Sequence, residues 1–155
     1  MFKITPTHLF QKLEREFTVM CEGPNEDSIV GTVMLLNHLR EWICPGGEKS
    51  YKGKRVEDMS PAERLHSQLW EKPEYHVVKD LCNGAKHCVD RDNLASRTDV
   101  LVGFRAGLGR AGDSLGVRHF IVDDREIRDI CAPVYAAYAA YFAALTLAPV
   151  QNNMT

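Results

Sequence analysis

Apolar side chains recur at every third or fourth position in five stretches of the chain, the spacing at which one face of an α-helix is buried. The predicted helices cover roughly residues 5–21, 25–43, 60–72, 73–90 and 123–147. The second has the most regular apolar stripe, so we expect it at the centre of the core. That stripe consists of Ile29, Val33, Leu36, Leu39 and Ile43.

Capping residues predict where these helices begin. Thr5 and Ser60 each precede a proline, and Asn25 follows a Gly-Pro break. Each of the three side chains can accept a hydrogen bond from the first helical turn. One of the pair Asp123-Asp124 is expected to cap the last helix. Pro133 is expected to kink or divide that helix, because proline lacks a backbone donor and crowds the preceding turn.

Apolar and polar residues alternate on both sides of the glycine-rich segment 107–113, which predicts two β-strands. We therefore expect a β-hairpin at about residues 98–123, inserted before the last helix. Three glycines in the connection are spaced as in a nucleotide-binding loop, but such a loop joins a strand to a helix and not two antiparallel strands. The predicted fold is mainly α, a bundle of about five helices with this hairpin, in one domain over residues 1–155.

Composition limits the classes of function. The 155 residues are 45% hydrophobic with a formal net charge of -2, so no overall positive field draws the protein to nucleic acid or an anionic membrane. Five scattered cysteines in mostly apolar runs suit free thiols in a reducing compartment, and we expect a cytoplasmic protein. The apolar run 132–150 is rich in alanine and tyrosine, and we do not expect it to span a membrane.

The segment 44–59 is rich in glycine and lysine and has no sustained periodicity, so we expect an exposed loop. Its basic side chains could clamp a phosphate, but we favour a solvated loop. These side chains are Lys49, Lys52, Lys54 and Arg55.

The stretch Glu74–Asp90 carries the clearest candidate chemistry. Asn83, Lys86 and His87 fall on one side of its predicted helix. An amide and an ammonium donate hydrogen bonds, and an imidazole exchanges a proton near neutral pH, so the three can hold a phosphate or a carboxylate. A purely structural role for the same residues, with a solvated lysine and a histidine at the helix end, is the open alternative.

The string Cys82-Asn83-Gly84-Ala85-Lys86-His87 resembles the motif of HEPN-domain ribonucleases, in which an arginine, often followed by asparagine, stands a few residues before a histidine. Together with His38-Leu39 and Trp42, it is also similar to uncharacterised bacterial helical proteins with H-L-x-x-W and N-x-x-K-H elements. The resemblance implies a small helical bundle of bacterial or phage origin. It also implies a homodimer, and in active members a metal-independent cleavage of RNA.

Cys82 stands where the family pattern has its catalytic arginine, and a thiol cannot give a bidentate cation to a phosphate. We therefore expect a noncatalytic binding or regulatory protein that acts through a protein or RNA partner. The enzyme alternative is a ribonuclease in which His87 moves the proton. In that alternative Lys86 or Lys79 partly replaces the cation, and Asn83 orients the phosphate.

Partner-binding candidates lie outside this motif as well. We name His38, Arg40 and Trp42 in the second helix, where His38 and Trp42 are one turn apart, and Arg110 at the hairpin tip. No cofactor and no metal are expected. A metal bound by Cys82, His87 and Cys88 is the alternative, although that spacing is not an ordinary zinc pattern. The fourth ligand would then be His38, His66, His76 or His119. A Cys-His nucleophile pair is disfavoured because Cys82 lies on the apolar stripe.

Overall fold

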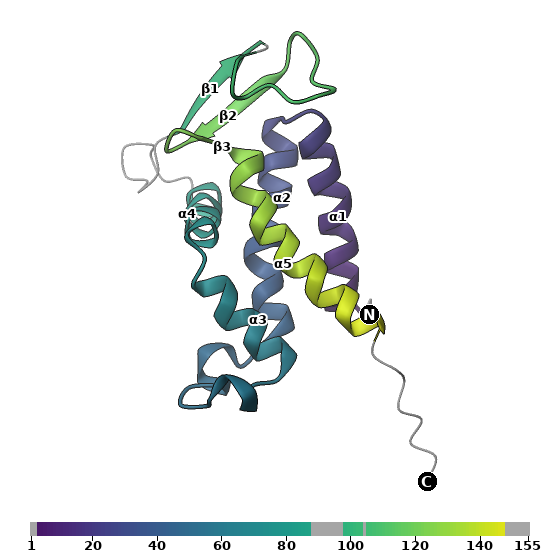
Figure 1. The fold of residues 1–155 in the computed structure, drawn as a ribbon, viewed down its shortest axis with the longest axis vertical. Helices are drawn as coiled ribbons and strands as arrows, with labels where there is room; N and C mark the ends of the chain where they lie inside the picture. The colour runs from purple at the N-terminus through teal and green to yellow at the C-terminus, as the bar shows by residue number, and fades with distance from the viewer. Residues whose placement is uncertain (1–2, 88–97, 104, 148–155) are drawn as a thin grey trace.

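Five α-helices and a three-stranded antiparallel sheet are present in the part of the chain that is described, residues 3–87, 98–103 and 105–147 of a computed structural model (Figure 1). The predicted fold class, a mainly α bundle with a β-hairpin before the last helix, is confirmed. The helices are α1 (Pro6–Glu22), α2 (Glu26–Ile43), α3 (Pro61–Trp70), α4 (Pro73–His87) and α5 (Ile127–Leu147). The strands, in their order across the sheet, are β1 (Thr98–Val102), β2 (Arg118–Val122) and β3 (Arg125–Glu126).

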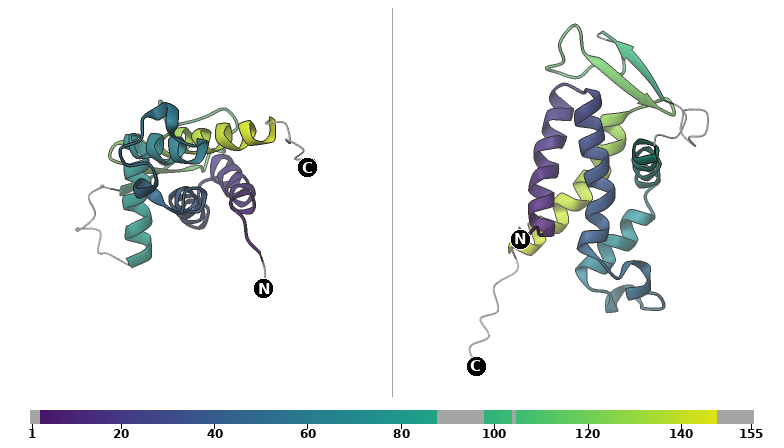
Figure 2. Two further views of the ribbon diagram at one scale, coloured as in Figure 1. Left: turned by 90° about the horizontal axis from the view of Figure 1, so that it is seen from below. Right: turned by 180° about the vertical axis from the view of Figure 1, so that it is seen from behind.

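Helix α2 is the central helix, as its apolar stripe predicts. It contacts α1, α3, α4 and α5, and Figure 2 shows α1 and α2 side by side with α5 crossing behind them. Val33, Leu36 and Leu39 are buried in the core. The hydroxyl of Tyr138 in α5 donates a 2.7 Å hydrogen bond to the backbone oxygen of Leu36, which ties the two helices together inside the core.

The three helix starts predicted from capping residues are confirmed. Thr5, Asn25 and Ser60 each accept a hydrogen bond from the third residue of the following helix, and each helix returns a side chain to the cap backbone. These reciprocal bonds satisfy backbone donors that have no partner within the helix.

The prediction for Asp123-Asp124 is wrong. Both residues form the turn between β2 and β3, with φ of 49° and 63°, and α5 begins later, at Ile127. Aspartate tolerates this left-handed conformation better than most residues. The two-residue strand β3, which pairs with Ile121 and Val122, was not expected from the sequence.

Pro133 does not divide the last helix, because α5 runs unbroken from Ile127 to Leu147. The backbone oxygen that loses its partner at a proline is four residues earlier, here that of Asp129, which is an exposed residue. Within the described ranges, α5 is also the one helix long and apolar enough to cross a membrane by length and composition. Its contacts with the other four helices are those of a core helix.

Segment 44–59 is mostly exposed, as its composition predicts, but it is more regular than the loop that we expected. It contains two short 3₁₀ helices, η1 (Gly47–Ser50) and η2 (Val56–Asp58), and the ring of Tyr51 is buried between them. The ammonium of Lys54 lies 2.8 Å from a carboxylate oxygen of Glu63 in α3 and holds the pKa of that carboxyl down to about 2. Lys54 is therefore paired within the fold.

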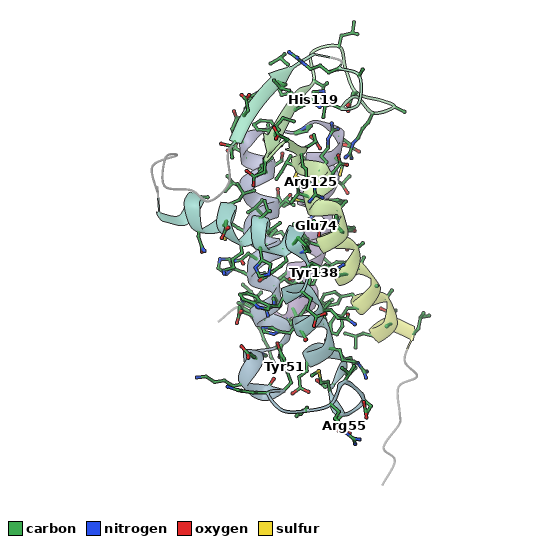
Figure 3. The ribbon with its side chains drawn as sticks, turned by 60° about the vertical axis from the view of Figure 1, so that its left-hand side comes forward. Tyr51, Arg55, Glu74, His119, Arg125 and Tyr138 are labelled. Atoms are coloured by element: carbon green, nitrogen blue, oxygen red, sulfur yellow. The ribbon has the colours of Figure 1, made fainter. Side chains whose placement is uncertain are left out.

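A buried ion network attaches the hairpin connection to the helices. The guanidinium of Arg128, fully buried in the first turn of α5, lies 2.9 Å from carboxylate oxygens of both Asp113 and Glu126. It also donates to the backbone oxygen of Cys21 at the end of α1. Figure 3 shows His119, which contacts the same guanidinium, at the sheet end of the molecule, and Tyr51 towards the opposite end.

Candidate functional site

The sequence motif on α4 is only partly described by the structure. The backbones of Asn83, Lys86 and His87 lie in the last turns of α4, and Asn83 is exposed. The side chains of Lys86 and His87, and all of Cys88, fall outside the described part of the chain. The assignment of these residues to an active site or a metal site therefore stays a prediction.

Cys82 and His38 meet where α4 packs on α2. The thiol of Cys82 is fully buried, as its place on the apolar stripe predicts, and its sulfur is 4.0 Å from Nε2 of His38. The side-chain amide of Asn37 donates to the same sulfur at 3.4 Å and accepts from the hydroxyl of Tyr75. His38 thus lies beside the α4 motif, although it is far from it in sequence.

Arg40 is buried rather than presented to solvent. Its position in α2 faces α3 and α4, where its Nε donates to the backbone oxygen of His66 and its Nη2 contacts Nδ1 of the same histidine, both at 3.0 Å. The guanidinium also lies over aromatic rings, 4.9 Å from the ring centroid of Trp70 and 5.2 Å from that of Tyr75. These contacts offset the cost of removing the guanidinium from water.

Lys79 reaches the same tryptophan. Its Nζ is 4.8 Å from the ring centroid of Trp70, whose side chain is 45% exposed at the C-terminal end of α3. Two candidates from separate parts of the sequence, Arg40 and Lys79, are thereby brought to the junction of α2, α3 and α4, whereas His38 lies where α2 contacts α4. We call Arg40, His66, Trp70 and Lys79 the junction site.

His66 holds a single protonation state at this site. Nδ1 accepts from Arg40, which can only donate, and the hydroxyl of Tyr51 contacts Nδ1 at 3.0 Å as well. Desolvation, and next the charge of Arg40, lower the pKa of His66 from its ordinary value of 6.5. The ring is therefore neutral near pH 7, and its proton is on Nε2.

Nε2 of His66 is a buried donor with no hydrogen-bond partner within the described residues. The side chain of His66 is only 3% exposed, yet it lines an open polar pocket of about 640 Å³. The nearest carboxylate oxygen, Oε1 of Glu41, is 3.9 Å away, which is too far for a hydrogen bond. The remaining lining residues are Arg40, Pro45, Gly46, Gly47, Glu48, Lys49, Tyr51, Ser67, Trp70 and Glu71.

Two candidates lie away from the junction site. Trp42 is 45% exposed on α2 and does not line the pocket. Arg110 belongs to the hairpin connection, where its guanidinium pairs with Asp129 of α5 and lies 3.7 Å from Glu126. Arg110 thus takes part in the ion network around Arg128.

Of the residues that line the pocket, the sequence analysis names Arg40 as a binding candidate and Lys49 as a possible phosphate ligand, but it does not predict the pocket itself. It considered His66 only as an additional metal ligand, and it placed Tyr51 in an exposed loop. The one local signal is that His66 and Trp70 stand four residues apart, so they share a face of α3. In the described residues, no group of three or more histidine, cysteine, aspartate or glutamate side chains is placed to hold a metal ion.

Comparison of the chain with protein-family models, with curated proteins and with solved structures found no match.

Proposed function

We propose that the chain is a HEPN-like, noncatalytic binding protein of the cytoplasm, and that it captures a protein partner at the junction site. The observation that carries this proposal is Trp70. Its half-exposed ring lies beside two cations, Arg40 and Lys79, and lines an open polar pocket. Tryptophan, tyrosine and arginine are the residue types that most often dominate the binding free energy of protein interfaces.

The charges around the pocket favour a protein partner over RNA. The cations Arg40 and Lys49 share the lining with the carboxylates of Glu41, Glu48 and Glu71. RNA binding depends mainly on cations that neutralise consecutive phosphates, and three carboxylates oppose this. A protein surface that carries both positive and negative side chains can be complementary to a pocket lining of mixed charge.

Two features support a role without catalysis. Cys82, at the position of the family's arginine, is buried, so this position supplies no cation to a substrate. His66 has no free lone pair towards the pocket, because Nδ1 is occupied and Nε2 carries the proton. An imidazole in that state cannot take a proton as a general base.

Affinity capture tests the proposal. Immobilised full-length chain should retain a protein from cell extract, and Trp70→Ala should lose most of it, because a central tryptophan typically contributes about 2 kcal/mol or more. The matched control is Leu115→Ala, which removes an apolar side chain that is 89% exposed on the hairpin connection, away from the pocket. This variant should retain the protein. Equal retention by Trp70→Ala and the wild type would exclude the junction site.

Nucleic-acid controls separate the alternatives. Pretreatment of the extract with ribonuclease should leave the captured protein in place, whereas its release would indicate an RNA partner. A HEPN-type ribonuclease would cleave purified RNA without metal, leave 2′,3′-cyclic phosphate ends, and lose this activity in His87→Ala. We expect no RNA cleavage by the wild type or by His87→Ala.

A further inference from the structure

Two hydrogen-bond donors on the pocket wall converge on one position. Nε2–H of His66 and Nη1 of Arg40 are 3.9 Å and 3.7 Å from the same atom, Oε1 of Glu41. Neither distance allows a hydrogen bond. Glu41 is 59% exposed, so its carboxylate stands at the rim of the pocket and the two donors remain unsatisfied by it.

We propose that the pocket binds a carboxylate group of the partner's polypeptide between His66 and Arg40, displacing the carboxylate of Glu41. This inference rests on the proposed function, because it names the group that the junction site recognises. A charged acceptor is the group that best satisfies a buried N–H and a guanidinium together.

The donors are fixed before any ligand arrives. The ring of His66 is held by Arg40 and by Tyr51 at Nδ1, and the guanidinium of Arg40 is held by the backbone oxygen of His66. Rotation of the ring would break these contacts. A ligand that binds donors already in place loses less conformational freedom than one that must order them.

The backbone next to Nε2 of His66 is that of a glycine. Gly47 has a φ of 53°, and a side chain there would place its first carbon 3.9 Å from Nε2. Glycine accommodates the left-handed backbone at the start of η1, and it brings no side chain into contact with the ring of His66.

Carboxylate fits the lining better than phosphate does. Glu41, Glu48 and Glu71 surround the pocket, and their repulsion grows with the charge of the ligand. A carboxylate brings one negative charge, whereas phosphate near neutral pH brings up to two. The carboxylate of Glu41, already near both donors, is a group of the same chemistry as the proposed ligand.

Propionate is a suitable probe, because it carries a carboxylate and little else. In a titration of the full-length chain followed by NMR, propionate should shift the His66 ring and Trp70 indole resonances saturably, with a Kd of about 1–10 mM. Propionamide has the same shape without the charge and should give no saturable shift. Inorganic phosphate should bind at least about tenfold more weakly than propionate. Equal binding of phosphate, or no saturable shift with propionate, would overturn the inference.

Two glutamine variants test the displacement of Glu41. Glu41→Gln removes the competing carboxylate and should lower the Kd for propionate roughly fivefold. The matched control, Glu71→Gln, removes a negative charge from the same lining and should change the Kd by less than about twofold. Both residues are exposed, so the two variants should fold as the wild type does. Equal effects would show that only the overall charge matters and would refute displacement.

The two proposals fail separately. The propionate titration needs no partner, and the capture experiment depends on Trp70 and not on the carboxylate. Loss of partner capture in Trp70→Ala together with no propionate binding would leave the proposed function standing and remove this inference. Propionate binding without any Trp70-dependent capture would leave a carboxylate-binding pocket but remove the protein partner, and with it the proposed function.

Discussion

At the residue scale, the chemistry of the junction site follows from how His66 is surrounded. Arg40 can only donate, so Nδ1 of the ring must accept its hydrogen bond. The hydroxyl of Tyr51 contacts the same nitrogen. Burial raises the pKa of the Tyr51 hydroxyl, so it remains a donor near neutral pH. The buried histidine is thereby a neutral donor facing a pocket, and this differs from the exchangeable histidine expected on α4.

The stability of the protein should depend on the protonation of His66. Folding lowers its pKa below 6.5, so just below that pH the unfolded chain binds more protons than the folded chain. The free energy of unfolding should therefore fall as the pH drops below 6.5, towards the lower pKa of the folded state. Arg40, Tyr51, Glu41 and Glu48 are the charged or titratable groups around the ring.

Urea unfolding between about pH 8 and about pH 5 measures this dependence. An NMR titration of the His66 ring assigns it to that residue, because the ring should titrate below 6.5. A ring that titrates at or above 6.5 would contradict the burial and the contact with Arg40 on which the prediction depends.

At the element scale, local sequence specified most of the helices but not their irregular connections. Thr5, Asn25 and Ser60 act within one turn of their own helix, so their caps could be predicted from sequence alone. The turn at Asp123-Asp124 accompanies the pairing of β2 with β3, and the ordered segment 44–59 contacts α3 through Lys54 and Glu63. Composition alone cannot reveal such contacts. The helix start predicted at Asp123-Asp124 was therefore wrong, and segment 44–59 is exposed as predicted but more ordered than expected.

Removal of the α3 cap should destabilise the protein. In the wild type, the backbone N–H of Glu63 donates a 3.2 Å hydrogen bond to the hydroxyl of Ser60. Ser60→Ala removes this acceptor and should lower the free energy of unfolding by about 1 kcal/mol. Urea unfolding monitored by circular dichroism measures the change. A Ser60→Thr variant keeps a capping hydroxyl and should lose less than half as much; equal losses would show that the hydroxyl is not the cause.

At the scale of the whole molecule, long-range contacts join elements that the sequence could only predict one by one. The junction site combines α2, α3 and α4, and the ion network of Arg128 combines α1, the hairpin connection and α5. Periodicity predicts which face of a helix is buried, but it does not identify the residue across the interface. The helices could therefore be predicted, whereas the pocket could not.

The ion network should be essential for attaching the hairpin connection. Arg128→Met removes the buried cation but leaves the carboxylates of Asp113 and Glu126, which are nearly fully buried, without it. The loss should be about 3–5 kcal/mol in the free energy of unfolding. Arg125→Met, which removes an exposed cation from its pair with Glu74, should cost less than about 1 kcal/mol. Similar losses in the two variants would contradict the role given to Arg128.

The carboxylate site, and the argument against base catalysis at the pocket, depend on one structural claim, that buried His66 carries its proton on Nε2, the nitrogen without a hydrogen-bond partner among the described residues. Nitrogen NMR of the imidazole, in protein labelled at histidine and held near pH 7, measures it directly, because protonated and unprotonated ring nitrogens give separate signals. We predict a proton on Nε2 and none on Nδ1. A proton on Nδ1, or a doubly protonated ring, would contradict the account.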